Sequence, residues 1–151
     1  MEWRIRTQAD ETLEDGVRDN LVAHNVAVSD AVRRRFEPEN LASRPVQAFA
    51  VADDGSLVGG CTGHTEDLWH WLTIDLMWVD PAARGTGLGR ALLASVEDEA
   101  RARGCRWSKL NTWEFQAPEF YERCGYVTYG REVDLPPGHV CLLYTSDAAD
   151  E

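Results

Sequence analysis

The stretch "LMWVDPAARGTGLGRALLASVEDEARARG", residues 76–104, contains the strongest structural signal in this chain. An apolar segment passes through three glycines in five residues and then directly into a helical pattern. Glycine lowers helix stability, so Gly85, Gly87 and Gly89 at the start of a helix indicate backbone that must approach another group closely. Glycines that serve only tight packing are the plainer alternative.

A phosphate group is the first candidate for that partner. The first amides of a helix lack intrahelical acceptors and carry partial positive charge, and the loop 84–90 adds Arg84 and Arg90. Removing Cβ atoms and adding arginines favours a pyrophosphate cradle. A P-loop is excluded because Gly89 is followed by Arg90 and Ala91 rather than by Lys and Ser or Thr.

The dinucleotide-binding pattern G-x-G-x-x-G fits the loop only in part. Gly85 and Gly87 occupy its first two places, but Arg90 stands in the third. No acidic residue follows near the end of the next predicted strand. A nicotinamide-dependent oxidoreductase is therefore disfavoured.

A third pattern matches at two separate places. "V-D-P-A-A" precedes "R-G-T-G-L-G-R", and "N-T-W-E-F-Q-A-P-E-F-Y-E-R-C-G-Y" follows at residues 111–126. Together these segments resemble the acetyl-coenzyme A signature of the GNAT superfamily of acyl-CoA N-acyltransferases. The resemblance extends from the first predicted strand to residue 144.

The order of predicted elements is that of an α/β fold. The resemblance implies a mixed, mostly antiparallel sheet of six to seven strands, splayed between strands 4 and 5, with about four helices. We expect one domain over residues 1–144, whereas the tail 145–151 is predicted to be disordered and, from its similarity to translated adapter sequence, non-native. Strands are predicted at 3–7, 46–53, 57–65, 68–79, 105–113, 125–133 and 139–145, and helices at 10–28, 30–36 (or as far as about 42, interrupted by Pro38), 88–104 and 117–124.

The glycine loop is followed by an amphipathic helix. Its predicted core stripe consists of Leu88, Ala91, Leu92, Ser95, Val96 and Ala100. The four cysteines (Cys61, Cys105, Cys124 and Cys141) sit in apolar segments without C-x-x-C spacing and are predicted to be reduced core thiols.

The resemblance implies that acetyl-CoA is the co-substrate. In such proteins the pantetheine arm lies in the splay and pairs with strand backbone, while the glycine loop holds the pyrophosphate. The residues expected to bind it are Leu76, Met77, Trp78, Val79, Arg84, Gly85, Thr86, Gly87, Leu88, Gly89, Arg90, Asn111, Ala117 and Phe120.

Two residues are candidates for proton transfer. Tyr121 matches the tyrosine that related enzymes place near the coenzyme sulfur as general acid, although packing on an apolar helix face would also explain it. Asp75 lies inside "W-L-T-I-D-L-M-W-V", where burial of a carboxylate would be costly without a purpose. We expect Asp75 to act as the base, directly or through water, or to bind the acceptor; a polar residue at a solvent-lined splay is the alternative.

The acceptor site is less clearly marked. Tryptophans flank the proposed cleft and acidic residues stand near the strand ends, but core packing and solvated surface charge are equally ordinary roles for them. The candidates are Trp69, Trp71, Trp113, Glu114 and Asp30. No histidine has metal-ligand spacing, so no metal is expected.

Composition limits the class of partner. The chain has 151 residues and a formal net charge of −11, which disfavours nucleic acid and favours a cationic small molecule. Without a long apolar run or a secretory signal, we expect a cytoplasmic protein with no membrane partner. We therefore expect an N-acetyltransferase for a small cationic amine, with aminoglycoside antibiotics as one candidate. Peptide, protein or amino-acid amines, or a non-catalytic coenzyme A-binding module, are the alternatives, and the resemblance also allows a homodimer.

Overall fold

The computed structural model describes residues 1–147, which fall into two compact units, one from Met1 to Ala42 and one beginning at Ser43. The first unit contains α1 (Glu11–Val28), α2 (Asp30–Arg35) and the short 3-10 helix η1 (Pro38–Asn40). Asp10 caps α1 by accepting a hydrogen bond from the Leu13 amide at 3.1 Å. The predicted helix 10–28 is thus confirmed, and the second helix ends before Pro38.

The predicted strand at residues 3–7 is wrong, because these residues form no regular secondary structure. An alternating sequence becomes a strand only where a neighbouring strand completes its hydrogen-bond ladder. Within the described part of the N-terminal unit, only helices accompany this segment. The sheet therefore has six strands, and the predicted strands 4 and 5 are β3 and β4 of the structure.

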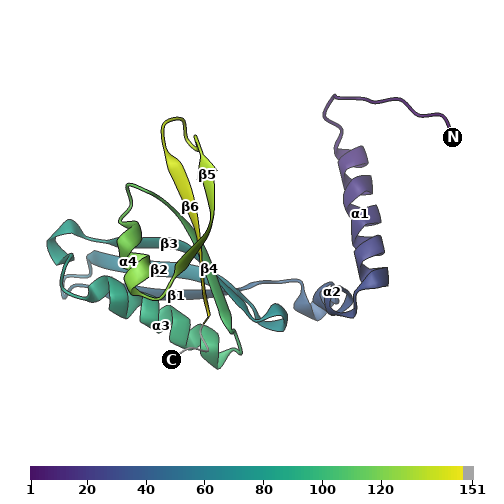
Figure 1. The fold of residues 1–151 in the computed structure, drawn as a ribbon. Coiled ribbons are helices and arrows are strands. Elements are labelled where there is room, and N and C mark those ends of the chain that lie inside the picture. The colour runs from purple at the N-terminus through teal and green to yellow at the C-terminus, as the bar shows by residue number, and fades with distance from the viewer. Residues whose placement is uncertain (148–151) are drawn as a thin grey trace. The chain divides into compact units, whose positions relative to one another are not determined.

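The second unit carries the whole sheet (Figure 1). Its order is β1-β2-β3-β4-β6-β5, and β3–β4 is the parallel pair in an otherwise antiparallel sheet. The mixed fold predicted from the sequence is confirmed. The elements are β1 (Arg44–Val51), β2 (Leu57–Glu66), η2 (Asp67–Trp69), β3 (Trp71–Val79), η3 (Pro81–Ala83), α3 (Leu88–Ala102), β4 (Trp107–Trp113), α4 (Pro118–Arg123), β5 (Val127–Val133) and β6 (Val140–Asp147).

The parallel pair is short. β3 and β4 are in register only at Trp71–Trp107, Leu72–Ser108 and Thr73–Lys109, after which the two strands separate. In Figure 1, β4, β6 and β5 turn away from the β1–β3 layer. The described strands therefore contain the predicted splay, and the second half of β3 has no β4 ladder along that edge.

A β-bulge lies at the point of separation. Thr62 of β2 pairs with Leu76 and Gly63 pairs with Ile74, so Asp75 is the extra residue of β3. A Cβ atom on Gly63 would lie 2.2 Å from the Thr73 carbonyl oxygen. Gly63 thus permits a close backbone approach that no other residue type allows.

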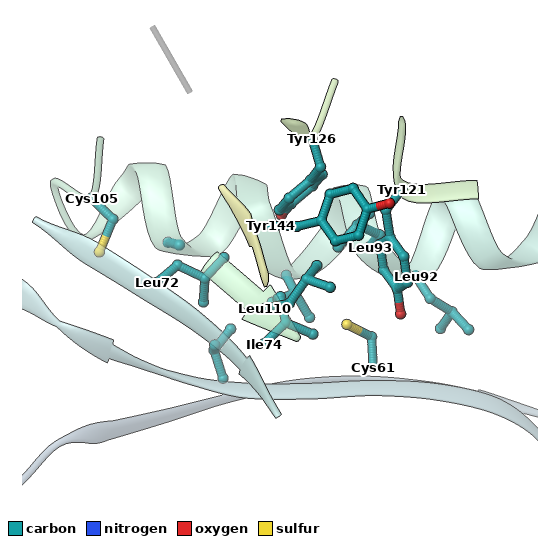
Figure 2. Packing of buried hydrophobic residues seen from close by; sticks show 13 residues of the cluster. Cys61, Leu72, Ile74, Leu92, Leu93, Cys105, Leu110, Tyr121, Tyr126 and Tyr144 are labelled. Carbon is teal, nitrogen blue, oxygen red and sulfur yellow. The ribbon is translucent and has the colours of Figure 1, made fainter. Parts of the chain in front are cut away.

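The core lies between the sheet and α3, as Figure 2 shows. The buried face of α3 consists of Leu92, Leu93, Val96 and Ala100. The predicted stripe was wrong at Ala91 and Ser95, which are exposed, and it missed Leu93. The buried face differs from the predicted stripe because α3 packs against both the sheet and the tyrosines of α4 and β6.

The C-terminal strand is longer than predicted. β6 continues to Asp147, and its residues 145–147 pair with Lys109, Ser108 and Trp107. The predicted disorder is therefore wrong for these three residues, because the first three residues of β4 complete their hydrogen-bond ladder. The predicted tail beyond them, 148–151, lies outside the described residues.

We expect Gly63→Ala to lower the free energy of unfolding, because the new Cβ must displace the Thr73 carbonyl in the sheet. Overpacking of this kind costs about 1–3 kcal/mol. Urea unfolding followed by circular dichroism measures the change. Gly130→Ala is the matched control, since its Cβ would meet the side chain of Leu143, whose flexible Cδ1 would be nearest at 3.1 Å, and no backbone atom among its nearest neighbours. Equal losses in both variants would contradict the account of the bulge.

Candidate active site

The loop between β3 and α3 presents an open helix N-terminus. Asp80 turns the chain by accepting a hydrogen bond from the Ala82 amide at 2.8 Å. Gly85 and Gly87 then adopt φ values of +74° and +86°, a region that favours glycine. Gly87 is the N-cap of α3, and no side chain caps the helix. The first amides of α3 are therefore available to an anion.

A cavity of about 450 Å³ extends from this loop to α4 and the end of β3. It is large enough for part of a drug-sized ligand. Both predicted motifs contribute to its wall, together with the separated half of β3. It is lined by Met77, Trp78, Val79, Ala83, Arg84, Gly85, Gly87, Gly89, Arg90, Gln116, Ala117, Phe120, Tyr121, Arg123 and Cys124.

Gly89 brings three elements together at the cavity. A Cβ atom there would lie 3.4 Å from the Phe120 ring and 3.5 Å from the Met77 Cε. This Cβ atom would be in ordinary van der Waals contact with both side chains, so only a side chain larger than that of alanine would push α3 away from α4 and β3. Of the three glycines in the loop, this one serves close packing, whereas Gly85 and Gly87 serve the turn.

Three arginines give the cavity a positive wall. Arg84 Nε donates to the Val79 carbonyl at 3.1 Å, and Arg90 Nη2 donates to the Arg123 carbonyl at 3.1 Å. Both guanidinium groups are thus held against the protein while they line the cavity beside Arg123. Positive side chains next to open helix amides are suited to phosphate groups.

Tyr121 reaches the cavity from the core. Its side chain is 8% exposed and lies among Phe120, Tyr126 and Tyr144, with ring centroids 5.1–6.3 Å apart. Figure 2 shows the ring between α3 and the sheet, near Leu92 and Cys61. Burial raises the pKa of Tyr121 to about 12. Its phenol is therefore protonated at neutral pH and can donate a proton.

Asp75 is not the buried carboxylate that its apolar segment suggested. Its side chain is 48% exposed, since the bulge directs it out of the packed layer. The carboxylate has a defined partner: its Oδ2 lies 2.9 Å from Nδ1 of His64 on β2. The expectation of burial is corrected, and a histidine that sequence patterns did not single out joins Asp75.

The remaining predicted coenzyme residues are absent from the described cavity wall. Leu76 is exposed at the bulge, and Leu88 packs against the core. Thr86 donates its hydroxyl hydrogen bond to the Ala83 carbonyl at 2.6 Å and so closes the turn. Asn111 is exposed on β4, two residues beyond Lys109, the last β4 residue that pairs with β3.

The aromatic acceptor candidates are divided between two clusters. Trp71 stacks on Trp107 with ring centroids 5.9 Å apart. Trp113 stacks on Phe115 at 5.6 Å and donates Nε1–H to the Leu135 carbonyl. Trp69 lies in η2, apart from the described cavity wall.

The two acidic acceptor candidates already hold partners within the protein. Glu114 accepts from the Val140 amide at 2.9 Å and lies 2.7 Å from Nδ1 of His139. The hydrogen bond with His139 lowers the pKa of the Glu114 carboxyl. Asp30 belongs to the N-terminal unit, where it bonds Arg33.

Sequence reasoning missed several residues of the site. Ala83, Gln116, Arg123 and Cys124 line the cavity, and their positions within the two motif segments were the available signal. His64 had no such signal, because the bulge that pairs it with Asp75 depends on the register of two strands. Among the described residues, no cluster of three or more His, Cys, Asp and Glu side chains could hold a metal ion. No helix within residues 1–147 is long and apolar enough to cross a membrane.

Because the pKa of Tyr121 is raised, we expect the free energy of unfolding to depend on pH in the alkaline range. The unfolded chain loses this proton near the ordinary tyrosine pKa of about 10, while the native protein keeps it up to about 12. Native stability should therefore fall as pH rises through this window. Chemical unfolding between pH 9 and 12 should show a shallower decline for Tyr121→Phe, and an unchanged slope would contradict a raised pKa.

Comparison with known proteins agrees with this geometry. Residues 12–126 match the profile of the acetyltransferase (GNAT) family. A blasticidin-S acetyltransferase from Streptomyces morookaense is 43% identical over 114 residues, which cover 73% of this chain and 82% of that protein. The crystal structure of an acetyltransferase from Bacillus cereus has a TM-score of 0.75 and 28% identity, covering 95% of this chain and 97% of that one.

A more distant structure shares the fold. An aminoglycoside 6'-N-acetyltransferase complexed with coenzyme A has a TM-score of 0.59 at 17% identity, with 78% of each chain covered. The two sequence motifs, the splayed sheet, the family match and the relatives agree with one another. This chain belongs to the GNAT acetyltransferase family.

Proposed function

We propose that this chain is an N-acetyltransferase that moves an acetyl group from acetyl-CoA to a primary amine of a small cationic molecule. One observation carries the proposal: a single cavity joins the uncapped N-terminus of α3 to the protonated phenol of Tyr121. If the N-terminus of α3 holds the diphosphate, the rest of the coenzyme would be directed along the edge of β3 that has separated from β4.

The chain offers matching groups for each part of the coenzyme. The amides of residues 84–90, with Arg84, Arg90 and Arg123, would hold the pyrophosphate. The backbone of Leu76 to Val79 has no β4 ladder along the open edge of β3, so its amides and carbonyls can pair with pantetheine. When bound, acetyl-CoA would supply the activated thioester.

Three further groups would assist transfer. Tyr121 would donate a proton to the departing sulfur, which its place in the cavity wall supports. A backbone amide of β3 near Met77 or Trp78 would polarise the carbonyl. Asp75 would serve the acceptor amine, as its position at the splay suggests.

The acceptor class rests on the relatives and on charge. The family member named for blasticidin S supports a small-molecule antibiotic, and a net charge of −11 favours a cationic one. Aminoglycosides belong to the same acceptor class, since their primary amines are cationic. Acetylation would remove the positive charge of the amine.

We expect acetyl-CoA-dependent release of free thiol with at least one cationic amine in a panel of blasticidin S, streptothricin, an aminoglycoside, a polyamine and a peptide with a free N-terminus. A thiol-reactive dye and mass spectrometry of the product measure the transfer. Turnover of the peptide alone would overturn the small-molecule assignment. Binding of acetyl-CoA without turnover of any amine would favour a non-catalytic coenzyme A module.

Tyr121→Phe should lower kcat on the order of 100- to 10,000-fold, the usual contribution of a positioned general acid. The dissociation constant for acetyl-CoA, measured by calorimetry, should stay near that of the wild type. Tyr129→Phe is the control, because Tyr129 is 59% exposed on β5 and is absent from the cavity wall described above. Unchanged turnover in Tyr121→Phe would rule out the acid role.

A further inference from the structure

We propose that His64 is the group that takes the proton from the acceptor amine, and that Asp75 positions it. This inference rests on the proposed function and refines the role of Asp75 in it. The observation is a hydrogen-bonded pair at the mouth of the splay, with His64 Nδ1 2.9 Å from Asp75 Oδ2. The two side chains are 34% and 48% exposed, so a ligand can reach both.

The pair lies on the sheet face opposite α3. β2 buries every second residue, Cys61, Gly63 and Thr65 among them, so His64 points to the other side. Thr65 confirms the direction, because its hydroxyl accepts a hydrogen bond at 3.1 Å from Arg103 at the end of α3. Tyr121 packs on the α3 side. The proton acceptor and the proton donor would thus face the splay from opposite sides.

Register places the pair beside the gap. Thr73 and Lys109 form the last paired position of β3 and β4. Asp75 comes two residues later on β3, and Asn111 comes two residues later on β4. Met77, two residues beyond Asp75, already lines the cavity. An amine that approaches the thioester from the face opposite α3 would therefore pass between the His64–Asp75 pair and Asn111.

The pair has the form of a general base with its orienting carboxylate. A neutral imidazole whose Nδ1–H donates to Asp75 leaves the Nε2 lone pair free to accept a proton. During transfer, the bond from the amine nitrogen to the acetyl carbon forms while the carbon–sulfur bond breaks. The proton lost by the nitrogen goes to Nε2, and the sulfur takes its proton from Tyr121.

The charged groups around His64 are few on this face. Glu66 follows two residues along β2, and Lys109 lies across β3 with its Nζ 5.7 Å from the centroid of the Trp71 ring. Pro45 is the paired neighbour on β1 and carries no charge. Asp75 is therefore the charged group in hydrogen-bond contact with the imidazole, and its carboxylate would orient the ring.

The test uses the full-length chain with the best acceptor from the amine panel. His64→Ala should lower kcat on the order of 100- to 10,000-fold while acetyl-CoA binding and the melting temperature stay close to wild type. Added imidazole should restore part of the activity. Asp75→Asn should lower kcat while the KM for the amine and the melting temperature stay close to wild type, because it removes the carboxylate that orients the His64 ring. His24→Gln, exposed on α1, is the control and should leave activity unchanged.

The outcomes separate this inference from the proposed function. If the wild type acetylates an amine but His64→Ala keeps its kcat, His64 is not the proton acceptor and the proposed function stands. Loss of activity in His64→Ala without any rescue by imidazole, together with an unchanged kcat in Asp75→Asn, would also overturn the inference. If the wild type acetylates nothing, the proposed function itself fails.

Discussion

The separation of β3 from β4 after Thr73 is the constraint on which the rest of the site depends. A parallel pair would normally continue its ladder, but here three paired positions are followed by divergence and a bulge. Because the strands separate, β3 keeps unpaired backbone groups along one edge and the cavity can extend beside them. The bulge at Asp75 also reverses which residues face α3, which brings Met77 to the cavity and leaves Asp75 outside.

The glycine loop works because each glycine solves a different problem. Gly85 and Gly87 turn the chain with positive φ so that α3 begins without a capping side chain, and its amides stay open. Gly89 instead lets Phe120 and Met77 approach the helix. As a result, α3, α4 and β3 converge on one cavity, which has an electropositive helix end at one side and a protonated tyrosine at another.

Local signals were sufficient for much of this arrangement. The helix start, the two motifs and the strand at 57–65 could be read from sequence, because capping, glycine φ and local strand patterns are short-range effects. The strand at 3–7 could not, since a strand needs a partner that sequence does not name. Neither could the His64–Asp75 pair, because a one-residue bulge changes which side chains meet. The buried face of α3 was misjudged at Ala91 and Ser95 because two layers pack on that helix.

The central claim is that backbone amides where residues 84–90 enter α3 bind the diphosphate of acetyl-CoA. Titration of ¹⁵N-labelled protein with acetyl-CoA, followed by NMR, tests it most directly. The account predicts that the amide resonances of Gly85, Gly87 and Gly89 shift strongly to lower field at saturation, while those of Gly55 and Gly138 in distant turns stay in place. Saturable binding that leaves the three loop amides unmoved would contradict it.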